Sequence, residues 1–175
     1  MEPSDQLLSK AFREGSEKAL SEAVHLYGPA LYYLCRRFTR NHEDADELVQ
    51  ETFVKAWEKR KKFRGDSTLR TWLTRIALNL SMNFMRKAKS RPQSAEVDGA
   101  SRPALSESPD GTFEKEDIQR AFEKLPPKQR AVVALRIVEE LPYEEIAEIL
   151  KCSVSAAKSN FHFAMNRMRE LLGQK

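Results

Sequence analysis

The side chains best suited to binding chemistry lie near the carboxyl end of the sequence. They carry hydroxyl, ammonium, imidazole, amide and guanidinium groups, spaced so that they share the outer face of one helix. Near a helix N-terminus, such groups can bond to base edges and phosphates in the major groove of DNA. The candidate residues are Ser155, Lys158, Ser159, His162, Asn166 and Arg167. A tight helical hairpin with a polar outer face that binds nothing would show the same spacing.

We predict that two helices, over residues 142–150 and 153–172, position these side chains. About three residues join them, which is the spacing of a helix-turn-helix. Pro142 is compatible with a helix start, because proline is tolerated in a first turn. Ala147 is small enough for the helices to cross closely. The apolar faces are Ile146, Ala147 and Leu150 in the first helix and Val154, Ala157, Phe161, Ala164, Met168 and Leu171 in the second.

A second group of candidate side chains lies on the helix with the most regular apolar pattern. Asn41 can cap this helix. One buried stripe is predicted from Ala45, Leu48, Val49, Thr52, Phe53, Ala56 and Trp57. The opposite face carries Asp46, Glu47, Gln50 and Glu51. Because Lys55 and Lys59 follow these acidic residues, the order of charges also suits the helix dipole, and a purely structural explanation is available.

A third group surrounds a short loop and the helix after it. The loop at residues 63–66 leads to Ser67, which can cap that helix. We expect Trp57 and Trp72 to lie in the core. The predicted buried stripe of the helix is Leu69, Trp72, Leu73, Ile76, Ala77, Leu80 and Phe84. Its outer face carries Arg70, Arg75, Asn79, Asn83, Arg86 and Lys87.

The charge of the chain is small in total and uneven in distribution. The 175 residues include 30 Lys+Arg and 26 Asp+Glu, a formal net charge of +4. Residues 1–90 carry +5, residues 91–112 carry −2 and residues 113–175 carry +1. Basic clusters at 55–64 and 86–91 favour contact with a polyanion, although ordinary solvated helix faces would give the same clusters.

The composition divides the chain into two helical blocks. Residues 90–112 contain three Pro, two Gly and five Ser with few large apolar side chains, which predicts a flexible linker. Helical patterns fill the flanking segments, and no strand alternation occurs. We therefore predict an all-α protein with two small domains, 1–89 and 113–175. A helix over residues 17–40 is expected to bend at Pro29.

The reactive residues give no sign of catalysis. The three histidines are scattered, the two cysteines are isolated, and no glycine-rich phosphate loop or nucleophile motif is present. The carboxylates near residue 46 could imitate a metal site, but no histidine lies at helical spacing from them. We expect no enzyme activity, metal, cofactor or small-molecule substrate. Because no apolar run approaches about 18 residues and no signal segment begins the sequence, a soluble, intracellular protein without membrane insertion is expected.

Two long motifs carry a family resemblance. The first comprises residues 44–57 (DADELVQETFVKAW), 63–67 (FRGDS) and 71–79 (TWLTRIALN); the second comprises 125–130 (LPPKQR) and 143–159. They resemble regions two and four of a bacterial sigma factor of the extracytoplasmic-function (ECF) group, the smallest members of the sigma-70 family. The resemblance covers about 140 of the 175 residues, in the family's order.

This resemblance implies a dissociable subunit that directs core RNA polymerase to particular promoters. It places Asp46, Glu47, Gln50 and Glu51 on the surface that grips a coiled coil of the largest catalytic polymerase subunit, where they could meet basic residues. It places region four on the polymerase flap. It further implies an inhibitory anti-sigma factor, so the chain would lie in the bacterial cytoplasm or be held at the membrane by that factor.

The resemblance also assigns promoter contacts. A base flipped from the non-template strand at the minus-ten element would be bound by amide groups and by an aromatic wall that Phe63 could supply. The minus-ten set is Phe63, Arg64, Asp66, Ser67, Arg70, Arg75, Asn79, Asn83, Arg86 and Lys87. At the minus-thirty-five element, Ser155, Lys158, Ser159 and His162 would face bases or nearby phosphates, with Asn166 and Arg167 further along the backbone.

Three positions depart from the family pattern. Lys151 stands where the turn commonly has glycine, and a left-handed conformation there would cost about 1 kcal/mol. Ala157 stands where the family usually has a β-branched residue. Asn160 replaces a common arginine and removes a phosphate contact, so promoter preference cannot be transferred from relatives.

The main alternative is a helix-turn-helix regulator that acts without joining core polymerase. Such a protein would need only the second block. It leaves the patterned segment 44–79 unexplained.

Overall fold

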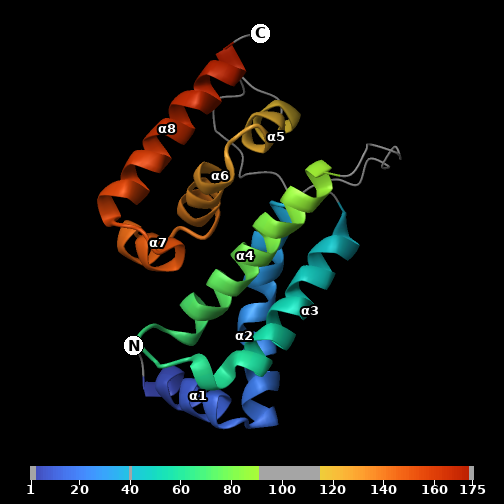
Figure 1. Ribbon diagram of the computed structural model, residues 1–175, viewed down its shortest axis with the longest axis vertical. Coiled ribbons are helices and arrows are strands. Elements are labelled where there is room, and N and C mark those ends of the chain that lie inside the picture. Colours follow the sequence, from blue (N-terminus) through green and yellow to red (C-terminus); the bar gives the residue numbers. More distant parts are fainter. Residues whose placement is uncertain (1–2, 40, 91–114, 174–175) are drawn as a thin grey trace. The chain divides into compact units, whose positions relative to one another are not determined.

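The computed structural model describes residues 3–39, 41–90 and 115–173. The chain divides into two compact units at residues 100 and 101 (Figure 1). Among the described residues all regular structure is helical, which confirms the all-α prediction. None of these helices is long and apolar enough to cross a lipid bilayer. The predicted linker, apart from Ser90, lies outside the described residues.

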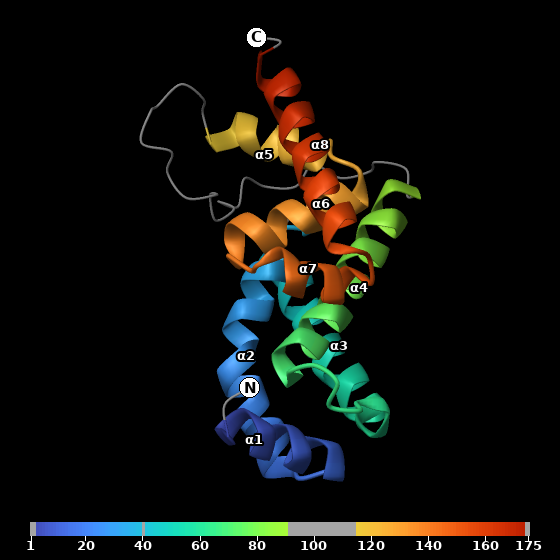
Figure 2. The ribbon, with the colours of Figure 1, turned by 90° about the vertical axis from the view of Figure 1, so that its left-hand side faces the viewer.

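The amino-terminal unit is a helical bundle. Its described elements are α1 (Pro3–Glu14), α2 (Glu17–Arg36), α3 (His42–Lys59), the 3-10 turn η1 (Arg60–Lys62) and α4 (Leu69–Ser90). Helices α2, α3 and α4 pack against one another, and α1 lies across one end of them (Figures 1 and 2). Helix α2 continues through Pro29 without a break and ends at Arg36, earlier than the predicted residue 40.

The starts of α3 and α4 are fixed by side-chain caps. Asn41 Oδ1 accepts the backbone N–H of Asp44 at 2.8 Å, as predicted. The predicted cap at Ser67 is wrong: Thr68 Oγ1 accepts the N–H of Thr71 at 3.1 Å, so α4 begins one residue later than expected. Both residue types are good caps, and the sequence alone does not decide between neighbours.

An aromatic cluster joins α1 to the rest of the bundle. Phe12 is fully buried and lies edge-on to Trp57 at 5.7 Å and to Trp72 at 6.4 Å between ring centroids. The expectation that both tryptophans are core residues needs correction, because each is only partly buried. The guanidinium of Arg60 lies 4.5 Å from the centroid of the Trp57 ring and covers one face of it.

The carboxyl-terminal unit packs shorter helices against one long helix. Its described elements are α5 (Lys115–Glu123), α6 (Pro127–Val133), the π-helical turn η2 (Ala134–Val138), α7 (Tyr143–Leu150) and α8 (Val154–Gly173). Helices α5, α6 and α7 each pack on α8. Arg130, part of the LPPKQR motif, is buried and donates to the carbonyl oxygens of Glu123 and Leu125. These hydrogen bonds connect α6 to the end of α5. Burial lowers the pKa of the guanidinium to about 10, so the group stays charged at neutral pH.

The two cysteines should differ sharply in reactivity. Cys35 is fully buried in α2, and burial raises the pKa of its thiol to about 11, partly offset by the hydroxyl of Ser81 that donates to Sγ. Cys152 is half-buried in the turn before α8. Because only the accessible thiolate reacts, a disulfide reagent at pH 7.5 should modify one thiol in the native protein and both after unfolding. Native Cys152→Ser should show almost no reaction; rapid modification of Cys35 would contradict the packing described.

Candidate nucleic-acid and protein interfaces

The acidic face of α3 is presented by a helix whose other side is fixed in the core. Ala45, Leu48 and Phe53 are buried, so α3 cannot rotate about its axis without exposing apolar surface. The four predicted binding residues point outward, with Asp46, Glu47 and Gln50 exposed and Glu51 partly exposed. The carboxylate of Glu51 pairs with Lys55 at 2.5 Å, one helical turn further on.

Val54 extends this face and was missed by the sequence analysis. It is 57% exposed and lies four residues after Gln50 and seven after Glu47, on the same side of the helix. The spacing from Gln50 and Glu47 was the available signal. The face therefore combines carboxylates and an amide with one apolar side chain, a mixture that suits a protein partner better than a polyanion.

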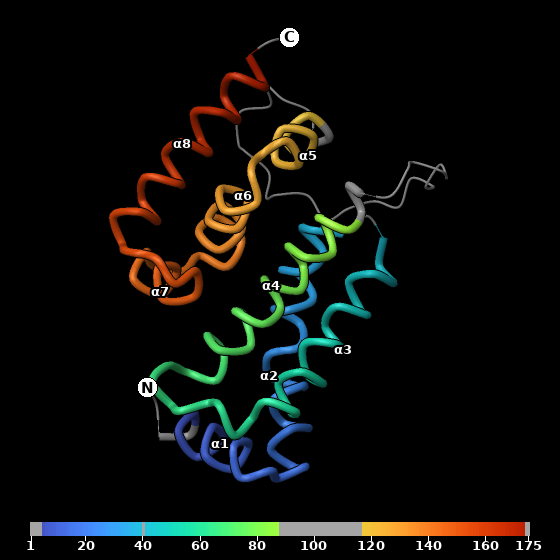
Figure 3. The backbone as a smooth tube through the Cα atoms, in the orientation of Figure 1, coloured from blue at the N-terminus to red at the C-terminus, as the bar shows by residue number. Residues whose placement is uncertain are grey.

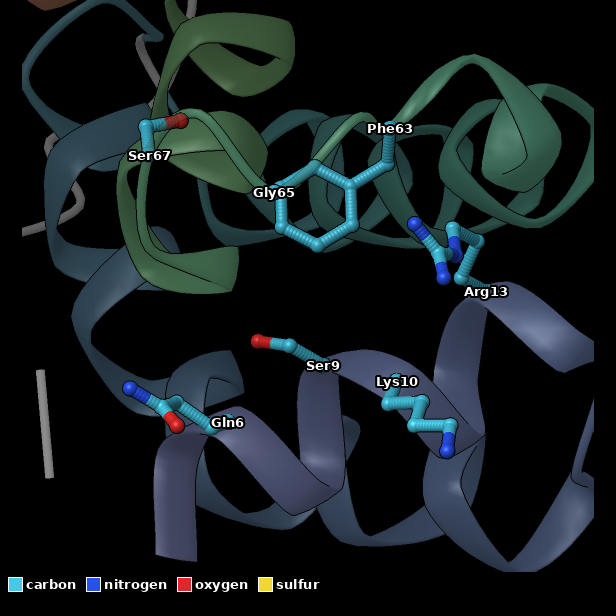
Figure 4. Close-up of a pocket in the computed structure, with 7 residues that line it drawn as sticks. All are labelled: Gln6, Ser9, Lys10, Arg13, Phe63, Gly65 and Ser67. Carbon is cyan, nitrogen blue, oxygen red and sulfur yellow. The ribbon is translucent and has the colours of Figure 1, made fainter. Parts of the chain in front are cut away.

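The loop before α4 forms one side of a small cavity, and α1 forms the other. The cavity has a volume of about 170 Å³ and is lined by Gln6, Ser9, Lys10, Arg13, Phe63, Gly65 and Ser67 (Figure 4). Gly65 has φ +83°, a conformation that side chains disfavour. Small-molecule sites usually measure about 300–1,000 Å³, so this cavity suits a single flat ring better than a larger ligand.

Phe63 is more buried than a free aromatic wall would be. It is 3% exposed, with its ring centroid 5.2 Å from that of Trp72, so it can serve only as an inner wall of the cavity. Ser9 Oγ points toward the cavity and has no hydrogen-bond partner among the described residues (Figure 4). The α1 residues were missed because 50 or more positions separate them from the loop.

The polar side chains of α4 do not all share one surface. Arg75, Asn79, Asn83, Arg86 and Lys87 follow one side of the helix at spacings of three or four residues, and Arg86 donates to Asn83 Oδ1. Arg70 lies away from this line, where its charge acts on the hydroxyl of Tyr27. Arg64 and Asp66 are exposed in the loop, and Ser67 is half-buried. The predicted minus-ten set thus forms a loop cluster and a line along α4, with Arg70 outside both.

A short turn joins α7 to α8 (Figure 3). The residue that ends α7, Lys151, is left-handed. Lys151 has φ 52° and ψ 52°, the conformation considered in the sequence analysis. Its N–H donates to the carbonyl of Glu148 at 3.3 Å, and that of Cys152 donates to Ala147 at 3.0 Å. This is a Schellman motif, in which the left-handed position usually carries glycine. Ser153 Oγ then caps α8.

Lys151→Gly should therefore stabilise the carboxyl-terminal unit. Relief of the left-handed strain should raise the free energy of unfolding by about 1–2 kcal/mol. Because glycine also increases the entropy of the unfolded chain, part of this is offset, and a net gain of about 1 kcal/mol is expected. Urea unfolding measures the gain. Lys158→Gly is the matched control, because glycine inside a helix costs about 1 kcal/mol. Destabilisation by both variants would exclude strain at Lys151.

The outer face of α8 presents the predicted DNA-contacting side chains, but not all of them are free. Ser155, Lys158, Ser159, His162 and Arg167 are exposed. Asn166 is half-buried: its amide donates to His162 Nε2 at 3.0 Å and its Oδ1 accepts from Arg169 at 2.9 Å. Asn166 thus orients its neighbours.

Cations above α7 complete this surface. The ammonium of Lys158 lies 5.7 Å and the guanidinium of Arg136 lies 4.9 Å from the centroid of the Tyr143 ring. Arg136 also donates to the carbonyl of Leu141 at 2.9 Å. Asn160 turns back and donates to the carbonyl of Ala156 at 2.9 Å. The part of the chain that the structure describes contains no group of three or more potential metal ligands.

Comparison with known proteins identifies this arrangement. Residues 23–91 match the family model of Sigma-70 region 2, and residues 115–168 match that of Sigma-70 region 4. The ECF RNA polymerase sigma-E factor of Escherichia coli strain K12 is 34% identical over 183 residues, covering 98% of this chain and 93% of that protein. The chain belongs to the sigma-70 family, in its ECF group. This confirms the family assignment made from the motifs.

Other proteins resemble the chain less closely in sequence but along most of its length. The RNA polymerase sigma-H factor of Pseudomonas aeruginosa is 29% identical and covers 96% of this chain and 93% of its own. The structure of CnrH in complex with the cytosolic domain of CnrY aligns with a TM-score of 0.73 at 26% identity, covering 98% of both chains. Sigma factor RpoE of Bartonella quintana, in complex with the anti-sigma factor NepR, aligns with a TM-score of 0.64 at 29% identity, covering 89% of this chain and 98% of its own.

Proposed function

We propose that this sigma-70 family chain directs core RNA polymerase to particular promoters and initiates transcription there. The observation that carries the proposal is the presence of regions 2 and 4, in order, in a chain whose sigma-factor relatives align over nearly all of its length. A regulator that used only its helix-turn-helix would have no need of the amino-terminal unit, so the region 2 match argues against that alternative. No catalytic step is assigned to the chain itself.

The acidic face of α3 is proposed to bind core polymerase. Asp46, Glu47, Gln50 and Glu51 would meet basic residues on the coiled coil of the largest catalytic subunit, and Val54 would add apolar contact. To bind a basic residue of the polymerase, the Glu51 carboxylate must leave its ion pair with Lys55 or contact both cations at once. Region 4 would dock on the polymerase flap.

The cavity between α1 and the 63–67 loop is proposed to receive a flipped minus-ten base. Its size supports one ring system, Phe63 supplies an apolar wall and the hydroxyls of Ser9 and Ser67 are available to a base edge. Arg64 and the line along α4 would follow the phosphates of the separated strand. The outer face of α8 would enter the major groove at the minus-thirty-five element.

Three further proposals concern the chain as a whole. Residues 1–89 and 113–175 would be the two functional domains, tethered by 90–112. The protein would act in the cytoplasm. The complex of the similar sigma factor RpoE with the anti-sigma factor NepR supports an anti-sigma factor as an inhibitory partner, which would be able to hold the chain at the membrane.

Reconstitution with bacterial core polymerase tests the function. The full chain should co-elute with core polymerase on a sizing column and should produce promoter-specific transcripts that core polymerase alone does not give. Addition of the chain to a holoenzyme already saturated with another sigma factor is the control for activator-like behaviour. Failure to bind core polymerase would rule out the sigma function.

A further inference from the structure

One large apolar side chain stands on the otherwise polar outer face of α8. Phe163 is 59% exposed, and its ring lies edge-on to that of His162, with centroids 6.1 Å apart. It lies four residues after Ser159 and four before Arg167, so the three side chains share one side of the helix.

Packing within the unit does not account for this exposure. The buried side of α8 is formed by Ala157, Ala164 and Met168, which point away from Phe163. A polar residue at this position would keep the helix and its packing unchanged. The ring therefore needs a partner outside the folded unit, or it is a solitary surface hydrophobe of the kind that many proteins carry.

The surroundings favour DNA as that partner. Lys158 and Arg167 are exposed cations on the same helix, and hydroxyls at Ser155 and Ser159 lie on the turns before the ring. A protein-docking face would be expected to offer several apolar anchors together, whereas Phe163 is the single exposed large hydrophobic residue of α8. In a major groove, the one apolar group that distinguishes a base pair is the C5-methyl of thymine.

We propose that Phe163 recognises a thymine in the upstream promoter element by packing its ring against the C5-methyl group. This inference rests on the proposed function, because it requires α8 to lie in the major groove. Burying one methyl group is worth about a fourfold preference, so the ring should set one position of the preferred sequence without dominating affinity.

A library experiment with the full chain and core polymerase tests this inference. The upstream element is randomised in a promoter that the wild-type holoenzyme transcribes, and transcripts are counted for each sequence. The wild-type chain should favour thymine at one position by about fourfold. Phe163→Ala should lose this preference and keep the preferences at all other positions. Phe163→Leu should keep most of the thymine preference. Because Phe163 is exposed, the melting temperature of Phe163→Ala should match that of the wild type.

A second arm removes only the methyl group. Deoxyuridine in place of the favoured thymine should lower wild-type transcription about fourfold and leave Phe163→Ala unchanged. The inference is overturned if both chains respond equally, if Phe163→Ala lowers all templates evenly, or if its one effect is weaker binding of an inhibitory protein. Absence of any specific transcript with the wild-type chain would instead overturn the proposed function, and this inference with it.

Discussion

Phe12→Ala should lower the free energy of unfolding of the amino-terminal unit by about 3–5 kcal/mol. Phe12 is fully buried and lies edge-on to both tryptophans of the unit, so truncation removes two aromatic contacts and leaves a cavity between α1 and the bundle. Since small domains have about 5–15 kcal/mol of stability in total, much of the unit's stability would be lost. Thermal and urea unfolding followed by tryptophan fluorescence measure the change.

Leu7→Ala is the matched control for this prediction. Leu7 lies on the same helix but is 70% exposed, so its truncation should change stability by less than about 0.5 kcal/mol. Equal effects of the two variants would mean that α1 is not anchored through Phe12. The result matters for function because α1 lies outside the segment that matches region 2, which starts at residue 23, yet supplies four residues that line the loop cavity.

Local patterns predicted the bundle helices well. Ala45, Leu48, Thr52, Phe53 and Ala56 are buried as their spacing indicates, whereas Val49 and Trp57 of the predicted stripe are only half-buried. Asn41 caps α3 as predicted. The correct predictions depend on residues within one or two turns of each other. The short spacing between two helical patterns placed the α7–α8 turn, and the family resemblance, in which glycine is common at this position, indicated that Lys151 could be left-handed. Choices between adjacent residues, such as Ser67 and Thr68, depend on how the whole loop is held and were not determined locally.

The candidate site could be predicted only in part, because some of its features arise from tertiary packing. The helical period placed Asp46 and Gln50 on an exposed face, but it could not show that α1 closes a cavity over Phe63. The spacing of Arg70, five residues before Arg75, would have separated it from the line of polar residues on α4, which are three or four residues apart, but this signal was not used. Where a side chain is apolar but exposed, as Phe163 is, a search for polar groups overlooks it.

The double variant Gln50→Ala, Glu51→Ala should weaken binding to core polymerase by roughly 10- to 100-fold. Each side chain can form a hydrogen bond to the partner, and a typical bond contributes about 0.7–1.4 kcal/mol net of exchange with water, so the loss of two bonds gives this range. The fold should persist, because the Glu51–Lys55 pair is partly exposed and an exposed helical pair contributes only about 0.3–0.5 kcal/mol. Titration of labelled chain with core polymerase measures the affinity.

The matched control for this variant is Glu22→Ala, which removes an exposed carboxylate from α2 of the same unit. If acidic side chains anywhere on the unit drive binding, both variants should lose affinity about equally, because each removes one carboxylate. If the α3 face is a specific interface, Glu22→Ala should bind core polymerase with normal affinity. Raising the salt concentration should then weaken binding of the wild type more than that of the double variant, because screening acts on the charged contact that the double variant lacks. Unchanged affinity of the double variant would move the polymerase-binding surface away from the Gln50 and Glu51 end of α3, and the exposed Asp46 and Glu47 would be the next pair to test.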